Sequence, residues 1–380
     1  MSTLSTEHPP LPSYALIHSP LLWLNEEEQF WPGNPLEHAA LCVPQDPNGN
    51  KVPIPDHLLS NGEFQARLLE DPTVDKDDVF LCLAHDDPRV NARIEDLMST
   101  KGKPDPLTRR SSSPVWIIMV DKSAIVEPGV VDVFYFYFYP YNLGNIVAFN
   151  TFGNHVGDWE HSMVRFKNGE PIAVHLSAHA DGHSWAWQTM EKMENRPVGY
   201  VASGSHAMYG KNGKHAYSLV SFIGPIDYTS KGVLWDPALN YCAARYDVAT
   251  EKFSPLSAAL PSPTTTAFPP QPGAASLADP NSAGSTGPTS TPLEPAYNKD
   301  ITPEQTMAVL NFRGRWGNSF WDLRQPEPKD WIHWPIWATM GLSRKLACLK
   351  WAGGPSGPRW KSLERKGVTW NTTELLPRLV

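Results

Sequence analysis

The chain has 380 residues, 41% of them hydrophobic and 11% aromatic, so it can hold one large or two ordinary domains with a proper core. Its net charge of −8 gives no electrostatic reason to expect a nucleic-acid partner. The sequence has no polybasic run for a membrane surface, no apolar run near the ~20 residues that cross a bilayer, and no secretory signal at its N-terminus. We therefore expect an intracellular protein without a transmembrane segment.

The expected elements favour β structure, because 38 prolines and 15 tryptophans disfavour a helical bundle. In chain order, the strands are expected at 114–120, 130–138, 158–166, 171–177, 197–202 and 217–223. The strand at 130–138 is expected to end at Pro140, which cannot donate to a sheet ladder. An Asn168-Gly169 pair predicts a hairpin turn between two of the strands.

Helices are expected to be few and peripheral. Two candidates lie at 63–70 and 90–98, and a third follows the N-cap residue Thr302, with Pro303 at its first position. Several short strands with turns between them indicate a mainly β protein, an antiparallel β-sandwich decorated by short helices.

Residues 254–297 differ from the rest of the chain. Ten of residues 254–295 are proline and most others are Ser, Thr, Ala or Gly, so the segment cannot bury enough surface to offset its ordering entropy. We predict a disordered internal insertion. The sandwich core would occupy 1–253, with a disordered tail at 1–12, and residues 298–380 would return to the same core.

The four cysteines are widely scattered and form no CxxC pair, so they do not indicate a zinc ribbon or a redox motif. We expect buried, reduced thiols. These residues are Cys42, Cys82, Cys242 and Cys348.

The segment 154–161 places two carboxylates and two imidazoles within eight residues. If it enters a strand, Asp158 and Glu160 share one face while Trp159 and His161 share the other, because side chains alternate. His155 would lie in the preceding turn. Such a group suits a divalent cation or acid/base work by a carboxylate pair. The alternative is that these charges form only the solvated face of a half-exposed strand.

Histidines gather in the same part of the chain. Seven of the 13 lie between positions 155 and 215, which favours a shared polar pocket. They are His155, His161, His175, His179, His183, His206 and His215. His179, His183 and His206 are expected in loops or at strand ends, where binding groups often lie. His206 alone could instead be a buried histidine satisfied by the backbone.

Several segments resemble the fungal and plant family labelled vacuolar protein sorting-associated protein 62. They lie at 19–32, 153–161, 196–207, 314–317 and 354–361, nearly end to end along the chain. The resemblance implies a role in delivering proteins to the vacuole and a cytoplasmic or vacuole-associated location. It implies no particular chemistry.

The His155-x-x-Asp158-x-Glu160 spacing is also similar to that of the necrosis- and ethylene-inducing-peptide-like toxins. In those toxins the motif binds a divalent cation at one edge of a β-sandwich and helps engage sphingolipid head groups. The resemblance implies His155, Asp158 and Glu160 as ligands of Ca²⁺, Mg²⁺ or Mn²⁺. Asn142 stands where the toxins have an aspartate, which should weaken cation binding.

Two functional hypotheses follow. In the first, a non-enzymatic sorting protein binds a polar lipid or glycan head group at a cation site. His179, His183, Trp185 and His206 would contact the ligand. In the second, a metal-dependent hydrolase, lyase or cyclase of fungal metabolism uses Asp158 and Glu160 as metal ligands and general base, with His179 or His206 as general acid. In a third, purely structural interpretation, the cluster only ties loops together.

Overall fold

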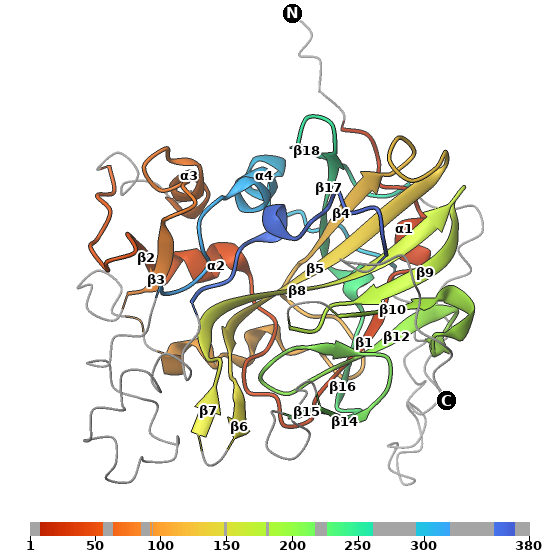
Figure 1. The fold of residues 1–380 in the computed structure, drawn as a ribbon, viewed down its shortest axis with the longest axis horizontal. Helices are drawn as coiled ribbons and strands as arrows, with labels where there is room; N and C mark the ends of the chain where they lie inside the picture. Colours follow the sequence, from red (N-terminus) through yellow and green to blue (C-terminus); the bar gives the residue numbers. More distant parts are fainter. Residues whose placement is uncertain are drawn as a thin grey trace, which may run out of the picture.

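Two stacked β-sheets form the framework of the protein (Figure 1). The computed structural model describes residues 8–55, 64–84, 92, 94–147, 150–179, 182–216, 226–260, 294–319 and 353–368. The larger sheet has seven strands, antiparallel except for the parallel pair β4 and β17. Its order is β10 (His183–Ala186), β9 (Glu170–Leu176), β8 (His155–Lys167), β5 (Val130–Asn142), β4 (Val115–Asp121), β17 (Tyr241–Asp247) and β18 (Lys252–Pro255).

The second sheet has five strands and pairs distant segments of the chain. Its order is β11 (Lys192–Met193), β12 (Arg196–Val201), β1 (Leu21–Leu24) and β16 (Val233–Trp235), with β13 (Met208–Tyr209) also on β12. β1 and β12 run parallel. The described residues also form three two-stranded ribbons: β2 (Cys42–Gln45) with β3 (Phe80–Leu83), β6 (Asn145–Val147) with β7 (Asn150–Phe152), and β14 (Gly213–Ala216) with β15 (Ile226–Thr229).

The described helices are short and lie around the sheets (Figure 1). The α-helices are α1 (Tyr14–Ile17), α2 (Pro35–Ala40), α3 (Phe64–Glu70) and α4 (Pro303–Asn311). The 3₁₀ turns are η2 (Ile94–Leu97), η3 (Thr100–Gly102), η4 (Trp187–Thr189), η5 (Pro237–Leu239) and η7 (Pro358–Trp360). The predicted fold class, a mainly antiparallel β-sandwich with peripheral helices, is confirmed.

The central strand β5 separates two apolar layers through its alternating sequence. Tyr135, Tyr137 and Tyr139 belong to the core between the two sheets, together with Leu22 and Trp235 of the smaller sheet. The intervening phenylalanines lie in a second core, with residues of α2, α3 and α4. Successive side chains of a strand point to opposite faces, so one strand contributes to both layers.

Most expected strands are present with shifted ends. The strand at 130–138 does not end at Pro140 but continues to Asn142. Pro140 is tolerated because the pairing of β4 with β5 ends at Phe136. Beyond that residue, β5 has no β4 strand to which a backbone N–H would have to donate. Asn168 and Gly169 both have positive φ, as a tight hairpin turn requires, which confirms the predicted turn. The strand expected at 217–223 lies outside the described residues.

The helix expectations are met in two of three places. α3 and α4 are present, and Thr302 caps α4 by accepting from the backbone of Gln305. The segment 90–98 forms only the 3₁₀ turn η2 within its described residues, so the expected α-helix is wrong there.

The described ends of the two segments that we expected to be disordered contain packed residues. Leu11 is buried and its amide donates to the carbonyl of Ser257, which lies just after β18. Leu256 is buried in the same core, so these two leucines offset the ordering entropy of their segments. Residues 1–7 and 261–293 lie outside the described part of the chain.

The described residues after 293 return to the same core as the rest of the chain. Val309, Trp316 and Leu363 lie in the apolar layer beside α2 and α3. The amide of Arg315 donates to the carbonyl of Val79, and that of Leu81 to the carbonyl of Arg315. Within the described residues, no helix is long and apolar enough to cross a membrane.

Candidate functional site

The two carboxylates of the motif lie on one face of β8, as the strand period predicts. Trp159 belongs to the opposite apolar layer. Asp158 pairs in register with Tyr139, and Glu160 with Tyr137. The residues are only 5% and 8% exposed, so the alternative of a solvated strand face is wrong. Buried carboxylates need compensating partners, since removing them from water is costly.

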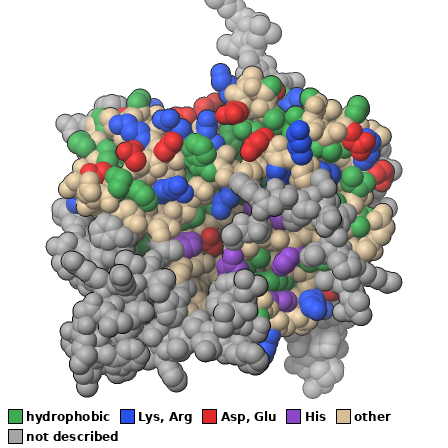
Figure 2. Space-filling view, in the orientation of Figure 1, with side chains coloured by type: hydrophobic (Ala, Val, Ile, Leu, Met, Phe, Trp, Pro, Cys, Tyr) green, Lys and Arg blue, Asp and Glu red, His purple; other side chains and the backbone are tan. Residues whose placement is uncertain are grey.

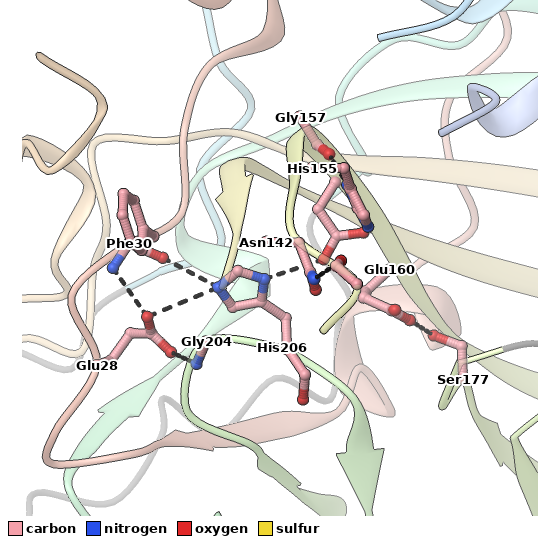
Figure 3. A network of polar contacts seen from close by, with 12 residues as sticks. Glu28, Phe30, Asn142, His155, Gly157, Glu160, Ser177, Gly204 and His206 are labelled. Carbon is pink, nitrogen blue, oxygen red and sulfur yellow. Dashed lines mark hydrogen bonds and ion pairs between the residues drawn. The ribbon is translucent and has the colours of Figure 1, made fainter. Parts of the chain in front are cut away.

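The partner of Asp158 is His206, on the loop after β12. The imidazole of His206 lies at the centre of the polar network in Figure 3. His206 Nδ1 donates to Asp158 Oδ2 at 2.9 Å, and its Nε2 donates to the carbonyl of Phe30 at 3.2 Å. The ring stacks on Tyr139 with a centroid separation of 3.7 Å and is fully buried. Because both acceptors are oxygen atoms, both ring nitrogens carry protons and the imidazole is charged.

A second carboxylate, that of Glu28, lies on the other side of His206. Its Oε1 is 3.7 Å from His206 Nε2 and accepts from the Phe30 amide, while Oε2 accepts from the amide of Gly204 (Figure 3). Burial lowers the pKa of His206, but Glu28 and Asp158 outweigh it and raise that pKa to about 10. His206 thus links the segment before α2, β8 and its own loop.

Glu160 has less positive charge around it than Asp158, which is bonded to the charged His206. Ser177 donates its hydroxyl to Glu160 Oε2 and accepts from the amide of His161 at 2.8 Å. Burial and the neighbouring Asp158 carboxylate raise the pKa of Glu160 to about 8. Burial also opposes the ionisation of Asp158, but the His206 hydrogen bond and nearby positive charges hold its pKa below the usual value. The environments of the two carboxyl groups therefore shift their pKa values in opposite directions.

His155 and Asn142 lie beside these carboxylates, at the paired ends of β8 and β5. His155 Nδ1 donates to the carbonyl of Gly157 at 2.6 Å, and burial lowers its pKa. In this tautomer Nε2 carries the lone pair. Asn142 donates its amide to the carbonyl of Gly153 at 2.8 Å. Among the described residues, no three His, Cys, Asp or Glu side chains are arranged closely enough to hold a metal ion by themselves.

His179 lies at the accessible side of the cluster, with 30% of its side chain exposed. Its Nε2 donates to Asp227 Oδ2 at 2.7 Å. Burial lowers its pKa, but Asp227, with smaller effects from Glu160 and Asp158, raises it overall. Asp227 also accepts from Ser205 and Tyr209, so it anchors the loop that carries His206. In Figure 2, several histidine side chains lie near one another in the middle of the molecule, beside an acidic side chain.

The remaining expected ligand-binding residues are divided between surface and core. His183 is exposed at the start of β10. Trp185 is 3% exposed and, with Trp187, packs in the core between the sheets. In the β10–β9 pairing, Trp185 lies opposite Val174, and both side chains belong to this core. The position of Trp185 therefore does not support the expectation that it contacts a ligand.

The structure adds three residues that the sequence did not single out: Glu28, Asp227 and Lys361. Glu28 ends a run of three glutamates that looks like a surface run, and Asp227 stands alone in the sequence. Lys361, after η7, lowers the pKa of Glu160 and of Asp158 through its charge. These long-range contacts leave no local signal, although Glu28 and Lys361 lie in or at the end of segments that carry the family resemblance.

Comparison with known proteins supports that resemblance. The family model "Vacuolar protein sorting-associated protein 62" matches residues 120–224, which contain β5, β8, β9 and the His206 loop. A Saccharomyces cerevisiae protein named putative vacuolar protein sorting-associated protein TDA6 is 29% identical over 93% of this chain and 68% of its own length. Vacuolar protein sorting-associated protein 62 of the same yeast is 33% identical over 65% of this chain. The chain spans 56% of that relative.

Two solved structures are similar to parts of this chain. One is necrosis- and ethylene-inducing protein 2 from the causal agent of witches' broom disease of cocoa, at 13% identity and a TM-score of 0.25, covering 55% of this chain and 73% of that one. Another is NLPPya in complex with glucosamine, at 12% identity and a TM-score of 0.24, covering 65% and 80%. The chain is thus similar to the vacuolar protein sorting-associated protein 62 family over residues 120–224, and to two yeast proteins named for vacuolar protein sorting.

Proposed function

We propose that this protein acts in vacuolar protein sorting, like the family it resembles, and that it binds a polar lipid or glycan head group through a divalent cation, Ca²⁺, Mg²⁺ or Mn²⁺, at Asp158 and Glu160. His155 and Asn142 complete the protein side of the site, and His179 and His183 lie on the side from which a ligand approaches. The protein would act in association with the vacuole. This location follows from the family alone.

The observation that supports the proposal most is the pair of buried carboxylates on one face of β8. Asp158 and Glu160 lie two residues apart and both are largely withdrawn from solvent. Carboxylate oxygens are the donors that hard divalent cations prefer. The Nδ1 bond of His155 to a backbone carbonyl also resembles the outer hydrogen bond that orients metal-binding imidazoles. The donor atoms of these residues are therefore of the types that bind a divalent cation.

The described protein residues supply too few ligands to surround a cation by themselves. This favours a cation that also contacts the bound head group. Since no three ionisable ligands converge within the described residues, water or ligand oxygens would have to fill the remaining positions. Mg²⁺ in particular is commonly held by one or two carboxylates and keeps exchangeable waters. Hydroxyl or phosphate oxygens of a head group could replace such waters. Bound there, the cation would offset the repulsion between the two carboxylates.

The first test measures cation-dependent stability. We expect Ca²⁺, Mg²⁺ or Mn²⁺ to raise the melting temperature of the protein over that in EDTA. A ligand that binds only the folded state stabilises it by about 2.7 kcal/mol at a hundredfold excess over its dissociation constant. The double variant Asp158→Asn with Glu160→Gln should lose the response. Glu127→Gln is the matched control, since Glu127 is an exposed partner of Lys167. Identical wild-type melting curves with EDTA and with each cation would exclude the site.

The second test concerns the head group. We expect wild-type protein to bind liposomes with inositol lipids, or immobilised glycans, only with the cation present, and Asp158→Ala to abolish this binding. Binding that survives both EDTA and Asp158→Ala would exclude this mechanism, while the resemblance to the family would remain.

The alternative, a metal-dependent enzyme, is favoured by one observation. His179 is partly exposed, is held by Asp227 and lies near the carboxylates, as a general acid would. His206 is less suited to that role, since it is fully buried with both ring nitrogens engaged. Turnover of a metabolite that is lost in both Asp158→Asn and His179→Gln would favour the enzyme.

A further inference from the structure

The opposite face of β8 and β9 carries a second polar cluster, formed by His161, His175 and Arg365. All three residues are more than nine-tenths buried. Within the described part of the chain, five of their nitrogen atoms lack a hydrogen-bond partner: Nδ1 and Nε2 of His161, Nε2 of His175, and Nε and Nη2 of Arg365. Buried polar groups in folded proteins are nearly always bonded, so a concentration of such atoms needs a cause.

The three side chains lie close together. The imidazole centroids of His161 and His175 are 5.4 Å apart, since β8 pairs with β9 in this region. The guanidinium carbon of Arg365 lies 5.0 Å from the ring centroid of Phe134, which is itself 5.9 Å from that of His161. Burial lowers the pKa of both histidines, and the charge of Arg365 lowers it further. This coupling is consistent with their proximity.

The ion pairs behind this cluster leave an excess of positive charge. Arg165 bonds Asp132 through two nitrogen atoms, at 2.7 and 2.8 Å, and Lys122 lies 3.8 Å from the same carboxylate. Lys122 also donates to the carbonyls of Leu363 and Arg365. With Arg365, three cationic side chains share the one buried carboxylate of Asp132, and the exposed Glu364 carboxylate also acts on Lys122 and Arg365.

We propose that Arg365, His161 and His175 form a binding site for a phosphate group, as inorganic phosphate or a phosphate monoester. A phosphate anion matches the remaining excess of positive charge, and its oxygens accept bonds from a guanidinium edge and from imidazole N–H groups. The site lies on the face of the sheet opposite Asp158 and Glu160, so it does not depend on the cation.

The direct test is calorimetric titration of the full chain with inorganic phosphate at neutral pH, in an amine buffer of fixed ionic strength. We expect one saturable site and at least tenfold weaker binding to Arg365→Gln. The matched control is Arg359→Gln, since the Arg359 guanidinium lies over the Trp360 ring near the surface and should leave phosphate binding unchanged. A second titration with acetate distinguishes phosphate from a simple carboxylate.

A further variant keeps the test decisive if Arg365→Gln does not fold. His161→Phe preserves an aromatic ring against Phe136, which stacks on His161 at 5.0 Å, while it removes both nitrogens. It should remain folded and bind phosphate more weakly. No saturable uptake by wild-type protein, equal affinity in Arg365→Gln or His161→Phe, or acetate binding as tight as that of phosphate would each overturn the assignment.

Discussion

Replacement of Gly157 by alanine should destabilise the protein strongly, because the C-terminal segment passes directly over this glycine. Gly157 has φ +68°, and a Cβ atom there would lie 1.8 Å from the carbonyl oxygen of Trp316. The left-handed backbone costs alanine of the order of 1 kcal/mol or more. Displacing a packed backbone adds about 1–3 kcal/mol. We expect Gly157→Ala to lower the free energy of unfolding by about 2–4 kcal/mol.

Gly153→Ala separates these two contributions. Gly153 also has a positive φ, +88°, but a Cβ atom added there would meet no heavy atom within 4 Å. It should therefore show only the conformational cost, of the order of 1 kcal/mol. Urea unfolding of both variants in EDTA measures the difference. Equal destabilisation of the two would refute the argument that the Trp316 carbonyl restricts position 157.

Two other predictions concern His206 and the proline-rich segment. The folded pKa of His206, about 10, exceeds its unfolded value of 6.5, so its stabilisation is complete below pH 6.5 and is lost as the pH rises toward 10. Over this pH range, the free energy of unfolding of the wild-type protein should fall by about 4 kcal/mol relative to that of His206→Gln, as measured by urea unfolding. A difference between the two proteins that does not change with pH would contradict this. Deletion of 262–291 should lower the free energy of unfolding by less than about 1 kcal/mol, because loop-closure entropy varies slowly with length. Leu256→Ala should lower it by about 2–5 kcal/mol. A comparable loss in the deletion variant would show that the deleted segment packs.

The local patterns predicted the sheet but not what surrounds it. Alternation in β5 and β8 and the Asn168-Gly169 turn identified strands and a hairpin, because strand periodicity and turn conformation are local properties. The same alternation placed Asp158 and Glu160 on one face. It could not show that this face is buried, since burial depends on the smaller sheet, whose strands β1, β12 and β16 come from distant parts of the chain.

The partners of the candidate site were harder to predict for the same reason. Glu28 and His206 are 178 positions apart, and His179 meets Asp227 across 48 residues. Nothing in the spacing of such pairs predicts contact. Trp185 was misplaced because an aromatic residue beside two histidines suits a binding surface as well as a core, and only the pairing of β10 with β9 decides between them.

The contact between Gly157 and Trp316 also has a consequence for biosynthesis. During translation, β5 and β8 emerge from the ribosome more than 140 residues before Trp316, whose segment covers Gly157. Lys122 precedes Leu363 and Arg365, whose carbonyls accept its hydrogen bonds, by an even longer stretch of chain. Domains begin to fold as they are synthesised, so an incomplete sheet with an exposed Phe-rich face would exist during translation. The start of β8 reaches its final environment only after Trp316 has been synthesised.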